Sequence, residues 1–391
     1  MIENKTGASV EKGNFFGREK ELKIAWRKIC DGNSLILAAP RRVGKTSFAK
    51  KLQEMAEQEE WDTLFLDLEG VHSEKEFVAT FIDKLNAKKG IVARGGQQII
   101  DIIKQVQTTI SAGGVDIGLG WKDQRADVFR NLAHLIEEMG KRQILIVLDE
   151  LAIFLDYLIG KDKENIENVQ FFLNWLRSFR QNRECAHLWI FCSSVSIENF
   201  LSIHKLSHTV NDIEPFKLGA LSDQEAIELL TALSDSYQIS MPDECKKYIL
   251  QKIGWALPFY IQIIFSEIRD LSCYNDLIKI TIENVNEAYE KLLSKQYFNT
   301  WEERLKEYTP LNKPMKLILD NLSKVPEGES RDMIKNKMLT LYNDIDEVDE
   351  ILGSILEILS NDGYIIRNKE TNKYQFRSFL LRDFWYNKFI A

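Results

Sequence analysis

The sequence predicts an α/β domain with a mostly parallel sheet, followed by a long, mainly helical region. Up to about residue 220, short apolar runs bounded by turn residues alternate with amphipathic stretches. After Leu221 the apolar spacing is helical only, and two short extended runs flank a polar turn at 368–372 near the C-terminus. Strands that alternate with helices need crossover connections, which favour parallel pairing.

Five apolar runs are expected to form the sheet, at 35–39, 63–68, 144–148, 188–192 and 216–218. The helices between them are expected near 45–58, 74–86, 125–139 and 169–180. Residues 87–120 fit this alternation poorly, so we interpret them as an insertion. Within it, the Gly113-Gly114 pair predicts a β-hairpin over Thr108–Gly120. The polar residues 1–13 are expected to be frayed.

The second half divides by pattern into three segments. Four helices are expected near 222–235, 242–254, 257–269 and 282–295, and a helical connector over 296–313. From Pro314 three helices precede a hairpin of 364–367 with 373–376 and an aromatic helix at 379–389. The predicted domains are therefore 1–220, 221–295 and 314–391, joined by the connector. We expect the last helix to dock on the first domain or on a partner.

Composition excludes several classes of protein. The 391 residues carry a net charge of −8, which disfavours non-specific coating of nucleic acid. Five scattered cysteines without a CxxC pair fit a reducing compartment and argue against disulfides or zinc. The five dispersed histidines show no metal spacing either. With no signal-peptide pattern and no apolar run near ~18 residues, we expect a cytoplasmic protein without a membrane partner.

One segment has the spacing of a phosphate-binding P-loop, with a strand predicted before it and a helix after it. It reads Ala39, Pro40, Arg41, Arg42, Val43, Gly44, Lys45, Thr46 and then Ser47, with alanine where the pattern begins with glycine. Backbone N–H groups of such a loop converge on phosphate oxygens. Gly44 allows close approach, Lys45 reaches the β- and γ-phosphates, and the Thr46 hydroxyl holds Mg²⁺. Arg41 and Arg42 either contact phosphate or a neighbouring subunit, or are solvated.

Polar residues that follow two later strands complete a predicted hydrolytic site. Asp149 and Glu150 end the strand at 144–148, which is the arrangement of a Walker B strand. We expect Asp149 near Mg²⁺ and Glu150 to act as the general base on the attacking water. Ser193 and Ser194 follow the strand at 188–192, where a polar side chain touches the γ-phosphate or the water; the alternative is a simple turn.

These residues resemble the archaeal-type STAND ATPases, relatives of the AAA+ ATPases and of origin-recognition initiators. The resemblance is carried by Phe16-Gly17-Arg18-Glu19, the P-loop, the strand that ends in Asp-Glu, Pro215-Phe216-x-Leu218, and Arg382–Trp385. It implies a three-layer α/β/α P-loop NTPase domain, a helical lid and a winged helix. It also implies that ATP is the nucleotide, that the backbone at Phe16, Gly17 and Arg18 lies near adenine, and that Pro258 lies near the nucleotide.

The chain departs from that family at two places. Gly254 and Pro258 are spaced more widely than the family's Gly-x-Pro. Where the family has an arginine before the last strand, this chain has Ser207-His208. Because an arginine finger is worth ~10³–10⁵ in rate, we expect slow turnover unless Arg177, Arg180 or Arg183 substitutes.

The resemblance implies a slow Mg-ATP switch that regulates a partner protein, such as a separately encoded nuclease, with a homo-oligomer as a further possibility. Two alternatives stay open, a DNA-acting AAA+ ATPase and a nucleotide-binding scaffold without turnover. The groove-facing helix expected within 344–362 disfavours DNA, since it is rich in acids and has no Lys or Arg. The hairpin cations Arg367, Lys369 and Lys373 still allow backbone contact.

Overall fold

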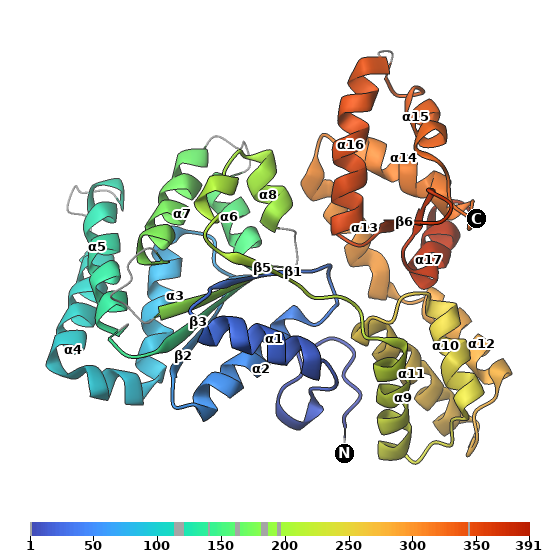
Figure 1. Ribbon diagram of the computed structural model, residues 1–391, viewed down its shortest axis with the longest axis horizontal. Coiled ribbons are helices and arrows are strands. Elements are labelled where there is room, and N and C mark those ends of the chain that lie inside the picture. Colours follow the sequence, from blue (N-terminus) through green and yellow to red (C-terminus); the bar gives the residue numbers. More distant parts are fainter. Residues whose placement is uncertain are drawn as a thin grey trace. The chain divides into compact units, whose positions relative to one another are not determined.

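The computed structural model describes residues 2–112, 121–139, 141–160, 165–180, 187–193, 197–342 and 345–391. Its internal contacts divide the chain into two units, both drawn in Figure 1. The sheet unit comprises Glu19–Ala39 and Lys45–Leu218. The helical unit comprises Met1–Arg18, Pro40–Gly44 and Gly219–Ala391. The predicted borders between lid, connector and winged helix are finer than this division and stay predictions.

The sheet unit is built on five parallel strands in the order β2-β3-β4-β1-β5. All five predicted strands are present, and the predicted α/β class is confirmed. Strand β3 is buried along its whole length, which explains its unbroken apolar run. The bounds are β1 Leu35–Ala38, β2 Asp62–Asp67, β3 Ile144–Asp149, β4 His187–Cys192 and β5 Glu214–Lys217.

Helices cover both faces of this sheet, which gives three layers (Figure 1). Helices α1 and α2 lie on one face, and α3, α6 and α7 lie on the other. The bounds are α1 Glu19–Cys30, α2 Lys45–Gln58, α3 Glu74–Ala87, α4 Lys89–Ala112, α5 Trp121–Met139, α6 Leu151–Ile159, α7 Ile166–Arg180 and α8 Ile197–Ile203. Among the described residues, no helix has the length and apolar character to cross a membrane.

The β-hairpin predicted over Thr108–Gly120 is wrong in its first part, because helix α4 continues to Ala112. Ile99, Ile102 and Val106 recur at helical spacing and are buried in the core, so burial of that face decides the structure. The Gly113-Gly114 pair and the rest of the predicted hairpin lie outside the described residues.

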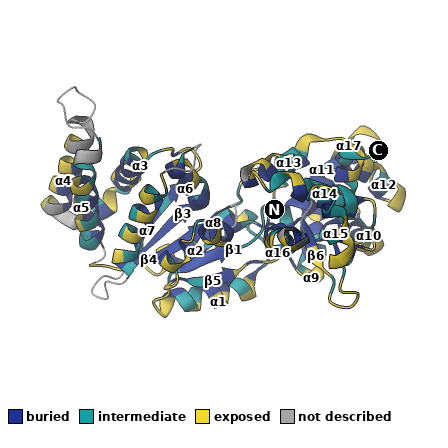
Figure 2. Cartoon of the chain, turned by 90° about the horizontal axis from the view of Figure 1, so that it is seen from above, coloured by how far each residue is buried: buried dark blue, intermediate teal, exposed yellow. Residues whose placement is uncertain are grey.

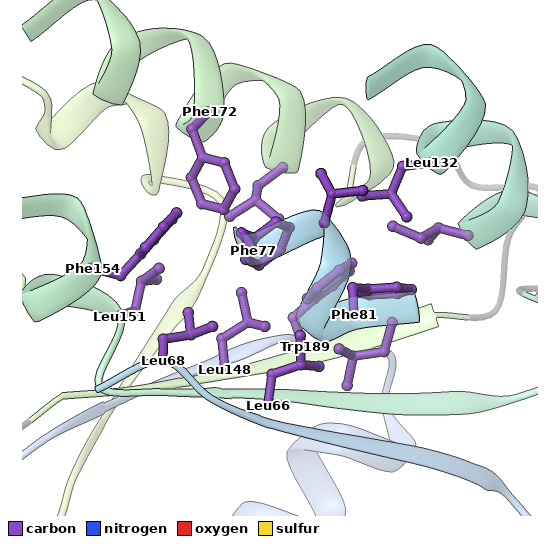
Figure 3. Packing of buried hydrophobic residues seen from close by; sticks show 14 of the residues in the cluster. Leu66, Leu68, Phe77, Phe81, Leu132, Leu148, Leu151, Phe154, Phe172 and Trp189 are labelled. Carbon is purple, nitrogen blue, oxygen red and sulfur yellow. The ribbon is translucent and has the colours of Figure 1, made fainter. Parts of the chain in front are cut away.

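An aromatic cluster fixes the helices of the second layer on the sheet. Phe77 of α3 meets Phe172 of α7 edge to face at 4.9 Å between ring centroids, and Phe154 of α6 stacks on Phe77 at 5.5 Å (Figure 3). All three rings are fully buried. In Figure 2 the strands beneath them are likewise dark blue, while the outer faces of the helices are exposed. This core holds the carboxyl ends of β3 and β4 in place.

The helical unit contains two groups of elements, and the assignment of the first as a lid and of the second as a winged helix stays a prediction. The first group is α9 Asp223–Ser236, α10 Asp243–Ile253, α11 Pro258–Tyr274 and α12 Ile282–Leu293, followed by α13 Asn299–Leu305. The second group is α14 Asn312–Ser323, α15 Arg331–Met338, α16 Ile345–Asn361, β6 Ile365–Arg367, β7 Tyr374–Phe376 and α17 Phe379–Phe389. Strands β6 and β7 are antiparallel, and Glu329 adds a bridge to Tyr374. The predicted order of elements is confirmed.

The final helix α17 packs on helices of the first group as well as on its own group. The Tyr289 hydroxyl of α12 donates to Asp383 at 2.7 Å, and Ser378 Oγ donates to the carbonyl of Ile253 at 3.0 Å. Phe384 packs against Phe298 at 5.0 Å. Docking of this helix on the first domain or on a partner, as expected from its aromatic residues, stays a prediction. Side chains of α17 join the two groups of elements into one packed body.

Residues near the N-terminus are hydrogen-bonded to the lid helices instead of being frayed. The backbone N–H of Ile2 donates to Ser236 Oγ at 2.9 Å, and that of Lys5 donates to Gln262 Oε1 at 2.9 Å. The expectation from polarity was wrong because backbone donors, which composition does not report, are satisfied by side chains of α9 and α11.

Candidate functional site

The P-loop connects β1 to α2 and leads directly into the first turn of that helix. Gly44 has φ +96°, a conformation that side-chain-bearing residues rarely adopt. A Cβ at Gly44 would have no neighbour within 4 Å. The positive φ, and not a steric clash, therefore explains the glycine. Lys45 is buried and its Nζ donates to the carbonyl of Ala39 at 2.7 Å, across the mouth of the loop. The ammonium thus lies beside the backbone N–H groups of the α2 N-terminus, a combination that binds phosphate.

Acidic side chains gather at the carboxyl edge of β2 and β3, beside the start of α2. Asp149 ends β3, is 4% exposed, and shares a hydrogen bond with the hydroxyl of Thr46. Its register partner on β2 is Asp67, and Glu150 follows it in the chain. Burial raises the pKa of Asp149 to about 6; the Thr46 hydrogen bond lowers it in part, and the charges of Glu150 and Asp67 raise it further.

This edge fits a divalent cation. A buried carboxylate whose pKa is raised by burial and by two neighbouring acids is stabilised by positive charge, and the Thr46 hydroxyl adds a second oxygen ligand. Across the described parts of the chain, no group of three or more His, Cys, Asp or Glu is arranged as a metal site. Two oxygen ligands from the protein suit Mg²⁺, which keeps several waters and takes its other ligands from phosphate.

Glu150 lies beside Asp149 at the N-terminus of α6, in a left-handed backbone conformation with φ +56°. Ser193 Oγ donates to Glu150 Oε2 at 3.5 Å and accepts from the backbone N–H of Ala152 at 3.3 Å. The structure therefore brings Ser193 to Glu150, and the predicted contact of a serine with the γ-phosphate or the water stays a prediction. Ser194 lies outside the described residues. A carboxylate held by a serine at a strand edge is suited to accept a proton from water.

The tip of the P-loop packs within the helical unit. Arg18 is buried, and its guanidinium donates to the carbonyls of Val43 and Gly219 at 2.8 and 2.9 Å. Arg42 lies with its guanidinium 4.3 Å from the ring centroid of Phe259. Arg42 is therefore packed on Phe259 instead of fully solvated, and its contact with phosphate or with a neighbouring subunit stays a prediction. Burial, followed by the charge of Arg41, lowers its pKa.

Gly17 and Arg18 both have positive φ, +68° and +67°, which turns the chain sharply before α1. The backbone N–H of Arg18 donates to Glu225 at 2.9 Å, and Glu225 also completes the capping box of α9 with Ser222. Gly17 and Arg18 therefore lie against the start of α9. Pro258 is the first residue of α11. Their predicted proximity to adenine stays a prediction, as does that of Pro258 to the nucleotide.

Two of the arginines considered as substitutes for an arginine finger, Arg177 and Arg180, form hydrogen bonds within the sheet unit. Arg180 is almost fully buried and forms a two-pronged pair with Asp212, at 2.8 and 3.1 Å. Arg177 donates to the carbonyl of His208 at 2.8 Å and to Asn211 at 3.0 Å. Both hold the loop before β5 in place, and Arg183 lies outside the described residues. The prediction of slow turnover is retained.

Two residues at this site were missed from the sequence. Asp67 ends β2, and only the β2-β3 register places it opposite Asp149. Cys192 ends β4 beside the site, and burial, together with the charge of Asp149, raises the pKa of its thiol. A strand order that puts the second and third strands side by side was the signal needed to find Asp67.

Comparison with known proteins gives a fold. No protein-family model matches the chain, and no curated protein matches its sequence. Among solved structures it is similar to a Walker-type ATPase of Pyrococcus abyssi, with TM-score 0.64, 16% identity, and 97% of this chain and 99% of that one covered. It is also similar to the ORC2 protein of Aeropyrum pernix in its ADPNP-ADP complexes, with TM-score 0.57, 13% identity and 96% of each chain covered. The chain has the fold of these archaeal P-loop ATPases along nearly its whole length.

Proposed function

We propose that this protein binds Mg-ATP at the P-loop and hydrolyses it slowly, as a switch that regulates a partner protein. The single observation that carries the proposal is the cluster at the strand edge, where Lys45, Thr46, Asp149 and Glu150 lie on one unit. Each has the chemistry that its place in an ATPase needs. ATP is preferred to other nucleotides by resemblance.

Hydrolysis at this site depends on positioning and charge. Lys45 Nζ exchanges the carbonyl of Ala39 for phosphate oxygens, and the N–H groups at the start of α2 hold the same oxygens. Mg²⁺, when bound by Thr46 and Asp149, neutralises phosphate charge. Glu150 accepts the proton of the attacking water, and Ser193 orients its carboxylate.

The regulatory part of the proposal rests on the helical unit. Lid and winged helix share one packed body through α17, so a change near the nucleotide is passed to the whole C-terminal region. We place the contact with a partner protein there, and a homo-oligomer is compatible with the same role. The partner protein must accept a negatively charged contact surface, because α16 has four described acidic residues. These are Asp346, Asp349, Glu350 and Glu357.

A nucleotide-binding titration tests the site. Wild-type protein is titrated with a fluorescent ATP analogue in the presence of Mg²⁺, beside Lys45→Ala and the exposed control Lys23→Ala. Loss of the Lys45 ammonium removes a charge-assisted phosphate contact, so we expect at least ~10-fold weaker binding for that variant alone. Equal affinity of the wild type and Lys45→Ala contradicts the assignment.

A DNA-acting ATPase is the second candidate, and the exposed cations Arg367 and Lys369 of the hairpin favour it. Three other cations of the winged helix are already paired within the domain. Arg331 and Lys335 of α15 both pair with Asp349 of α16, and Lys337 pairs with the buried Glu329. We therefore expect no specific duplex binding. Saturable binding of duplex DNA, with an affinity that falls steeply as salt rises, would favour the DNA-acting ATPase.

A further inference from the structure

Two aromatic side chains of the helical unit lie near the tip of the P-loop, Pro40–Gly44. Trp255 lies in the loop after α10, and Phe259 lies in the first turn of α11. Arg42 lies over the ring of Phe259, in the first turn of α11. Pro40 lies against Gly363, between α16 and β6, and Trp255 packs on the same glycine. All these residues belong to the helical unit. The loop that binds phosphate is thus also a packed part of the C-terminal body.

The packing at Gly363 leaves no free space. A Cβ built there would lie 2.9 Å from Cβ of Pro40 and 2.7 Å from the Trp255 ring, and φ is +86°. Trp255 also contacts Arg377, whose guanidinium lies 4.4 Å from a ring centroid of the indole. The backbone N–H of Arg377 donates to the carbonyl of Tyr364 at 2.9 Å. Contacts therefore run without a gap from Pro40 to the strands of the winged helix.

The Arg42 side chain takes part in this packing, and a bound nucleotide would compete for the same guanidinium group. Its backbone is left-handed, with φ +66°, which costs an L-residue free energy unless neighbours hold it. Its Nε is buried without a hydrogen-bond partner, so the ring of Phe259 is a weak substitute for an anion. Guanidinium groups bind phosphate through charge-assisted hydrogen bonds, which are stronger than most cation–π contacts.

We infer that the contact of Pro40 and Arg42 with Phe259, Trp255 and Gly363 is a nucleotide-sensitive latch on the winged helix. Phosphate at the P-loop draws Arg42 off Phe259 and loosens the contact at Gly363. By linkage, the latch and the nucleotide weaken each other by the same factor. The inference rests on the proposed nucleotide site and adds the route by which its occupancy reaches the C-terminal unit.

The test compares two phenylalanines of α11. Phe259→Leu removes the ring under Arg42, and Phe265→Leu removes a fully buried ring of the same helix that packs on Tyr237. Both variants lose similar core contacts, and both are first checked for folding by circular dichroism. A cation–π contact of about 0.5–2 kcal/mol corresponds to roughly 2- to 30-fold. We expect Phe259→Leu to bind the fluorescent ADP analogue tighter by that factor, and Phe265→Leu to match the wild type.

Amide hydrogen exchange supplies a second readout on the full-length wild type. With saturating Mg-ADP, exchange across Tyr364–Arg377 should rise, and in Phe259→Leu it should already be raised without nucleotide. Equal affinities of the two variants, weaker binding by Phe259→Leu, or unchanged exchange with nucleotide bound overturn the latch and leave the nucleotide site standing. Failure of the wild type to bind nucleotide overturns both.

Discussion

Replacement of Asp149 by asparagine should make the metal-free protein more stable at neutral and alkaline pH. Asp149 is 4% exposed, and burial raises its pKa to about 6 from an ordinary value of 3.8. A raised carboxyl pKa means that the folded protein binds this proton more tightly than the unfolded chain does. Ionisation of Asp149 therefore lowers the free energy of unfolding as pH rises above the pKa of the unfolded state. The loss is complete above the pKa of the folded state. Asparagine keeps the shape of the side chain and removes the charge.

The size of this effect follows from the two pKa values. A difference of about 2 units corresponds to about 3 kcal/mol at pH 8, and the cost falls to roughly half of that near pH 5. For a unit of this size, each kcal/mol shifts the melting temperature by about 2–4 °C, so we expect a gain of about 6–12 °C at pH 8.

The assay is thermal unfolding of the wild type and Asp149→Asn in EDTA, at pH 8 and near pH 5. Asp67→Asn serves as the control, because it removes a charge at the same edge from an exposed side chain and should give a smaller gain. With Mg-ADP present the order should reverse, since the wild type alone keeps the carboxylate ligand. A variant no more stable than the wild type at pH 8, or a gain that does not shrink near pH 5, refutes the reasoning.

Three further predictions concern single positions. Gly44→Ala places a Cβ at φ +96° and should weaken binding of the fluorescent ATP analogue at least ~10-fold, and unchanged affinity would count against the loop geometry. Asp212→Asn leaves the buried Arg180 without its carboxylate and should lower the free energy of unfolding by about 2–3 kcal/mol in urea titrations. Burial raises the pKa of Asp212, but the hydrogen bond and charge of Arg180 outweigh burial, so the pKa is lowered in the folded protein. The Arg180–Asp212 pair therefore stabilises the fold above about pH 4, and this stabilisation is lost as pH falls further. Phe77→Ala empties the centre of the aromatic cluster and should cost about 3–5 kcal/mol, with a loss under 1 kcal/mol arguing against the packing described.

The strand edges of the site were predictable because local pattern determines them. The run Ile144–Leu148 is apolar without interruption, as a strand buried on both faces must be, and Asp149 follows it. Gly44 and Lys45 have a fixed spacing that only a phosphate loop requires. Each of these two features spans only a few residues, so no knowledge of the tertiary fold was needed.

The parts that escaped prediction depend on contacts distant in the sequence. Asp67 joins Asp149 only through strand register, and Arg42 meets Phe259 across more than 200 positions. The helix end at Ala112 was missed because a glycine pair was read as a turn, while burial of Val106 and its neighbours extended the helix. The docking of α17 depended on lid residues such as Tyr289.

A single-turnover measurement tests the central claim most directly. Wild-type protein and Glu150→Gln, each in excess over radiolabelled ATP with Mg²⁺, are followed for conversion of bound ATP to ADP. Because Glu150 is assigned the proton of the attacking water and no phosphate contact, both proteins should bind ATP with similar affinity. The wild type should convert it slowly and completely, and the variant should retain ATP. Equal conversion rates in the two proteins, or bound ATP that the wild type never converts, contradict the account.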